Sequence, residues 1–141
     1  MSNLSVFLAG NKDVEETTKV VISNRYKVKG KPVAWEIKPV DSDTDEMLRK
    51  ECTKKTQVAG KRGQYTMDTD MDKYLSKLCV KCVVFPNLND AELQDSYNVK
   101  SAETLLKKLL LPGEYLELKA VVMEVNGFDV SMEDRIDEAK N

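Results

Sequence analysis

The residues with the clearest chemical potential are Cys79 and Cys82, in the sequence Cys-Val-Lys-Cys, and the more distant Cys52. Two thiols at this spacing can bind zinc or form a redox-active disulfide. Zinc needs four ligands, and because the chain contains no histidine, only Cys52 and a carboxylate could complete the set. The other interpretation places both cysteines on the buried side of a helix, where free cysteine is common. The sequence favours this second interpretation and predicts no metal site.

The absence of histidine also bears on catalysis. Histidine is the commonest general base, and nucleophilic sites that pair serine or cysteine with it are impossible here. The chain also lacks a glycine-rich phosphate-binding loop. We therefore predict no catalytic residue and no cofactor, and we expect a protein that acts by binding.

A second candidate site is a basic stretch, in which Glu51 is the one acidic residue. Its cations are Arg49, Lys50, Lys54, Lys55, Lys61 and Arg62. Such a cluster can contact phosphates, so a small nucleic-acid-binding regulator using the 49–62 region is the alternative function. However, no aromatic residues are interleaved with the cations, and the chain's net charge is −2. A solvated helix end and loop is the better explanation, and an acidic protein partner is the favoured functional use.

The strand pattern before this stretch predicts one antiparallel hairpin. Val20–Val28 and Val33–Ile37 flank Lys29-Gly30, which suits a two-residue turn. Such a turn sets the register of the whole hairpin. The expected pairs are Val28 with Lys31, Tyr26 with Val33, Asn24 with Trp35, and Ile22 with Ile37.

Helices account for most of the remaining pattern. Apolar residues recur at helical spacing, with caps or proline at the boundaries. Helices are expected from Ser42 to about Lys55, from Met71 to Phe85, from Asn89, over Ala102–Leu110, over Glu114–Val125, and from Ser131. The stretch from Gln57 to Thr66 is expected to be a loop.

Length and these patterns together predict an α+β fold. Residues 1–141 are expected to form a predominantly helical single domain, with one antiparallel β-hairpin at about 20–38 packed on helices. An acidic, mobile C-terminal segment is expected from about residue 129.

The helix expected over Glu114–Val125 is unusually apolar. Its apolar residues span an arc of roughly 220°, wider than the ~100° stripe of a surface helix. Such a helix lies centrally in the core, or a partner covers its outer side. Leu111 likewise faces away from the apolar side of the preceding helix. The residues predicted to bind a partner are Leu111, Tyr115, Leu116 and Met123.

Several segments resemble the XkdN-like tail assembly chaperones of tailed phages and prophages. The segments are PVAWEIKPV, LRKECTKK, GKRGQYT, KYLSKLCVKCVVFPNLNDAELQDSY, LLLPGEY and VNGFD. The resemblance implies a non-enzymatic protein of the bacterial host cytoplasm that is absent from the mature virion. It also implies a partner, the phage tape-measure protein, which is kept soluble until tail-tube subunits assemble around it. The tail-tube protein is a second candidate partner. The resemblance itself assigns no site residues.

Overall fold

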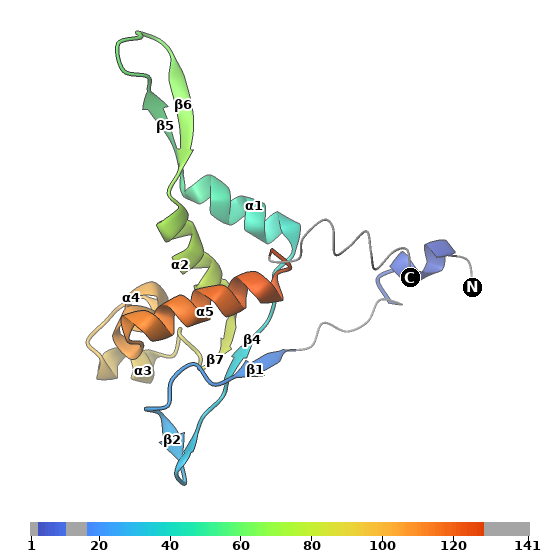
Figure 1. The fold of residues 1–141 in the computed structure, drawn as a ribbon, viewed down its shortest axis with the longest axis vertical. Helices are drawn as coiled ribbons and strands as arrows, with labels where there is room; N and C mark the ends of the chain where they lie inside the picture. Colours follow the sequence, from blue (N-terminus) through green and yellow to red (C-terminus); the bar gives the residue numbers. More distant parts are fainter. Residues whose placement is uncertain (1–2, 11–16, 129–141) are drawn as a thin grey trace.

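The computed structural model describes residues 3–10 and 17–128, which contain five α-helices and seven short β-strands (Figure 1). A short 3₁₀ helix, η1 (Asn3–Phe7), lies near the N-terminus. The α-helices are α1 (Ser42–Glu51), α2 (Met71–Cys82), α3 (Ala91–Ser96), α4 (Ala102–Leu109) and α5 (Pro112–Val125). The strands are β1 (Thr18–Val20), β2 (Lys27–Val28), β3 (Lys31–Pro32), β4 (Trp35–Ile37), β5 (Thr53–Gln57), β6 (Tyr65–Thr69) and β7 (Val83–Phe85).

The prediction of a predominantly helical domain with one hairpin is wrong. The described strands form three small sheets, ordered β1-β4-β7, β2-β3 and β5-β6, so the fold is a mixed α+β fold. The helix expected to reach Phe85 ends at Cys82, because Val83–Phe85 pairs with β4. The helix expected to reach Lys55 ends at Glu51, and β5 follows. The segments predicted from Ser131 and from residue 129 lie outside the described residues.

The hairpin expected at about 20–38 has the predicted tip but not the predicted register. Lys29 and Gly30 both have positive φ, as a two-residue turn requires, and Val28 pairs with Lys31. Further from the tip, however, Trp35 pairs with Val20 rather than with Asn24. The segment before the turn therefore contains four more residues than the segment after it, and β1 and β2 are separate strands.

Long-range contacts explain why the chain leaves the hairpin between β1 and β2. The Arg25 guanidinium donates to the Leu109 carbonyl at 2.9 Å and to the Glu114 carboxylate at 2.7 Å. The Tyr26 hydroxyl also donates to the Leu109 carbonyl. A continuous strand would hold these side chains in the hairpin. The extra residues instead let the segment reach the junction of α4 and α5.

Glu114 links this segment to the start of α5. Its carboxylate accepts hydrogen bonds from Arg25 and, at 2.8 Å, from the Leu111 amide at the helix N-cap. The Arg25 guanidinium first, and then the Leu111 amide, lower the pKa of Glu114 to about 2. The charged carboxylate is therefore the form that joins the two segments.

Helix α2 lies at the centre of the fold. It packs against α1, α4, α5 and β7, and its buried side chains are Tyr74, Leu78, Cys79 and Cys82. The Tyr74 hydroxyl donates to the Asp45 carboxylate on α1, and the Arg49 guanidinium lies 4.4 Å from the centre of the Tyr74 ring. Burial and then the bond to Asp45 raise the pKa of Tyr74 to about 12. Within the described residues, no helix is long and apolar enough to cross a membrane.

The Glu114 contacts predict a pH-dependent stability difference. Glu114→Gln keeps a hydrogen-bond acceptor but removes the charge, so the variant should unfold at a lower temperature than the native protein at pH 7. Because the folded pKa is lower than the ordinary value of about 4.5, this stabilisation is complete above that value. It should be lost as the pH falls from about 4.5 to about 2.

Thermal unfolding followed by circular dichroism across this pH range measures the difference. Glu117→Gln, at an exposed position on the same helix, is the matched control for removing one negative charge. A Glu114→Gln difference that stays constant down to pH 2 would contradict the ionic link to Arg25.

Candidate functional site

The junction of α4 and α5 forms an apolar ridge on the surface. Ser101 caps α4 by accepting from the Thr104 amide at 3.2 Å, and the helix buries its leucines on the core side. Pro112 begins α5, where its fixed φ suits the first helical turn and its missing amide hydrogen costs nothing. We call the surface formed by Leu111, Pro112 and Leu116 the α4–α5 ridge, whereas the neighbouring Leu110 and Tyr115 are buried in the core.

Two leucines of the α4–α5 ridge face solvent. Leu111 is 53% exposed and Leu116 is 65% exposed. A shallow cavity of about 500 Å³ lies beside Leu116, with the side chains of Lys107 and Lys119 in its lining. The Lys119 ammonium lies 4.5 Å from the centre of the Tyr115 ring. The site therefore combines exposed apolar groups with two cations, which suits an apolar segment that carries carboxylates.

The four residues predicted to bind a partner differ in exposure. Leu111 and Leu116 are exposed, whereas Tyr115 is buried and its hydroxyl donates to Ser76 at 3.0 Å. Met123 is half-buried and packs against the core. Leu111 and Leu116 are thus the two that present apolar surface without a change of structure, and the role of all four remains a prediction.

A second apolar site, which the sequence analysis missed, is a groove of about 240 Å³. We call it the aromatic groove. Its lining is Tyr26, Val33, Trp35, Phe85, Pro86, Leu93, Tyr97 and Leu109. Phe85 is 44% exposed at its rim, whereas Trp35 is buried. The groove can take an apolar side chain but holds no arrangement of acids and bases.

The aromatic groove could not be found from periodicity, because its residues come from separate segments. Trp35 is on β4, Phe85 ends β7, and Tyr97 follows α3. The available signal was the grouping of Phe85, Pro86 and Tyr97 in one short block of sequence, where two helices with a break between them were predicted.

The cysteine pair lies in the core, as the favoured interpretation predicted. Cys52, Cys79 and Cys82 are all buried free thiols. Burial raises the pKa of Cys79 to about 12 and also raises the pKa of Cys82. The side-chain amide of Asn126, the C-cap residue of α5, donates to the Cys82 sulfur at 3.4 Å, so this thiol contacts the end of α5. Among the described residues, no three cysteine or carboxylate side chains are grouped as a metal site would require.

The basic stretch is divided between two elements. Arg49 and Lys50 lie on α1 and form ion pairs with Asp45 and Glu46 at 3.0 and 3.5 Å. The later cations lie on β5 and in the turn after it, where helix and loop were expected. The stretch is therefore not one continuous patch on a single helix.

A protein-family comparison matches almost the whole chain. Residues 4–140 match the model described as phage XkdN-like tail assembly chaperone protein. Two relatives from Bacillus subtilis strain 168 align with 99% of this chain. The phage-like element PBSX protein XkdN is 30% identical, with 94% of its length covered. The uncharacterized protein YqbN is 31% identical, with 93% covered.

The crystal structure of YqbN has a similar fold. It superimposes with a TM-score of 0.77 at 27% sequence identity, covering 92% of this chain and 99% of the crystallised chain. The similarity in sequence therefore extends to the three-dimensional arrangement.

The buried thiols predict slow chemistry in the folded state. A thiol reagent at mildly alkaline pH should label the native protein more than about a hundredfold more slowly than the unfolded protein, because the thiolate is both buried and scarce. Absorbance-monitored labelling with and without denaturant measures this ratio. Elemental analysis of the same preparation should find no stoichiometric zinc. Rapid native labelling of Cys79 or Cys82, or one equivalent of zinc, would contradict the core assignment.

Proposed function

Because the chain belongs to the phage XkdN-like tail assembly chaperones, we propose that it binds a helical segment of the phage tape-measure protein. It holds this protein soluble in the host cytoplasm until tail-tube subunits assemble around it, and it does not remain in the mature virion. The tail-tube protein is a second partner of the same complex. The chaperone acts by binding and has no catalytic step.

The observation that carries the proposal is the exposed apolar surface of the α4–α5 ridge. Leu111 and Leu116 are each more than half exposed, and Leu116 lines a shallow cavity. An amphipathic helix presents apolar side chains every three or four residues along one face, and such a face can pack against the exposed leucines of the ridge. Burying a leucine side chain contributes about 1.5–3 kcal/mol, so two leucines at the centre of an interface are a substantial part of an affinity.

Charges beside the α4–α5 ridge favour a particular orientation of the partner. Lys107 lies on α4 and Lys119 lies on α5, and both side chains line the cavity. Carboxylates on the flanks of a docked helix would lie close to them. Complementary charge at the rim of an interface sets specificity and association rate more than affinity.

This function predicts a separation of binding from stability. The double variant Leu111→Ser/Leu116→Gln should weaken binding of the tape-measure protein by about tenfold to a hundredfold, because apolar anchors dominate interface energies. Its unfolding temperature should stay near that of the native protein, because both side chains are exposed and serine and glutamine suit an N-cap and a helix.

The measurement is co-expression with the tape-measure protein encoded in the same tail gene cluster, followed by titration of the purified proteins. Met47→Gln on α1, 44% exposed, is the control for removing an exposed apolar helix residue elsewhere. Absence of any complex with the unaltered chain would contradict the proposed function. If the Phe85→Thr variant loses binding and the double variant binds as well as the native protein, the binding site is the aromatic groove instead of the α4–α5 ridge.

A further inference from the structure

Strands β5 and β6 form an arm that projects from the body of the protein (Figure 1). They pair with each other over five positions, from Thr53 opposite Thr69 to Gln57 opposite Tyr65, and with no other described strand. All five residues of β6 are exposed, as are four of the five in β5. We call residues 53–69 the arm.

The arm has a defined direction because its base is fixed to two helices. The Thr53 hydroxyl donates to the Arg49 carbonyl on α1 at 2.6 Å, and the Asp70 amide donates to the Cys52 carbonyl at 2.8 Å. Cys52 is buried, and Asp70 caps α2. An isolated two-stranded hairpin is marginally stable in water, so the arm contributes little to the core that supports it. Its exposed surface is available for binding.

One side of the arm carries its two large apolar side chains, Tyr65 and Met67, among the polar residues Thr53, Lys55, Gln57 and Thr69. Alternation along the strands puts Tyr65 and Met67 on the same side as Lys55, and puts Lys54, Thr66 and Asp68 on the other. Tyr65 is 52% exposed and Met67 is 68% exposed. The Lys55 ammonium lies 4.6 Å from the centre of the Tyr65 ring. An aromatic ring, a thioether and a cation therefore form one continuous strip.

The arm is also the basic part of an acidic chain. It carries Lys54, Lys55, Lys61 and Arg62 against the single carboxylate of Asp68, a net charge of +3, whereas the whole chain has a net charge of −2. Two arms would repel each other, so the arm of a second copy is a poor partner. A protein segment with carboxylates beside apolar residues complements both the charge and the strip.

Nucleic acid fits the arm less well than an acidic protein segment does. Lys54 and Lys55 lie near the base and Lys61 and Arg62 at the tip, with neutral residues between them. A nucleic-acid strand presents a phosphate roughly every 3.4 Å and gains most of its affinity from a continuous row of cations. The neutral middle of the arm and the carboxylate of Asp68 interrupt such a row.

We infer that the arm is a second docking element, which holds an acidic, amphipathic segment of the tape-measure protein against Tyr65, Met67 and the cations of the arm, including those at its tip. This inference rests on the proposed function and adds a contact remote from the α4–α5 ridge. Apolar contact with Tyr65 and Met67 supplies affinity, and the cations select carboxylates.

Two arm variants test the inference in the complex with the tape-measure protein. Lys61→Glu/Arg62→Glu should weaken binding about tenfold at low salt and reduce its salt dependence. Tyr65→Thr/Met67→Thr should weaken binding about tenfold at any salt, because threonine keeps strand propensity but removes the apolar strip. Circular dichroism and thermal unfolding establish that both variants remain folded.

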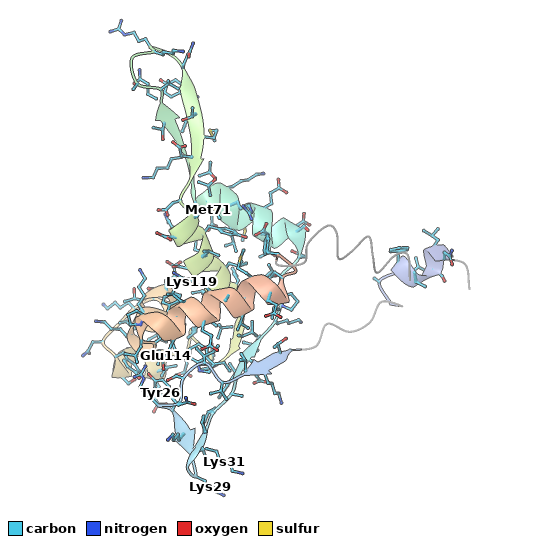
Figure 2. All side chains as sticks on the ribbon, in the orientation of Figure 1. Tyr26, Lys29, Lys31, Met71, Glu114 and Lys119 are labelled. Atoms are coloured by element: carbon cyan, nitrogen blue, oxygen red, sulfur yellow. The ribbon has the colours of Figure 1, made fainter. Side chains whose placement is uncertain are left out.

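The β2–β3 hairpin provides matched controls. Lys29 and Lys31 lie at its tip, far from Met71 at the base of the arm (Figure 2), and Val28 is 62% exposed. The variants Lys29→Glu/Lys31→Glu and Val28→Thr should bind the tape-measure protein with an affinity within about twofold of the native value, because these positions lie outside the proposed interface.

The possible outcomes separate the inference from the proposed function. If the unaltered chain does not bind the tape-measure protein, the proposed function fails and the inference with it. If it binds and both arm variants bind equally well, with unchanged salt dependence, the inference alone is wrong. Sedimentation of each variant, and titration with a short DNA duplex, test the other occupants. Self-association or DNA binding that only the arm variants lose would also overturn the inference.

Discussion

Burial of one face of helix α2 is the constraint on which the rest of the fold depends. Its buried side chains contact α1, α4 and α5, and its C-terminal end continues directly into β7. Leu78, Cys79 and Cys82 need only apolar surroundings, whereas Tyr74 must also satisfy a hydroxyl. The bond from Tyr74 to Asp45 meets this need and fixes α1 relative to α2. The arm then inherits its direction, because it connects these two helices.

Elements set by local pattern were predictable from the sequence. The apolar repeat that begins at Met71 located α2, and the apolar residues over Glu114–Val125 located α5 and its last residue. Some boundaries were less accurate. The helix expected from Glu114 begins instead at Pro112, a position where proline is favoured. Helix α3 is capped by Asp90, one residue after the predicted start.

Elements set by distant contacts or by exposure were not predictable. The hairpin register depends on Arg25 reaching Leu109 and Glu114, which are more than eighty positions away in the sequence. Strand β7 depends on β4 as its neighbour, and its three residues follow a helix without a polar break. The strands of the arm are exposed on both sides, so they lack the alternation that identifies a half-buried strand.

The same distinction applies to the candidate sites. Apolar residues outside the core-facing stripe of a single helix pointed to Leu111 and Leu116, whereas the aromatic groove is assembled from several segments. The exposed residues of the α4–α5 ridge and of the arm lie outside the core that α2 organises. Since neither surface contributes to that core, both can vary in sequence without loss of the fold. A chaperone that binds its partner through the proposed surfaces can therefore change them while keeping the same central helix.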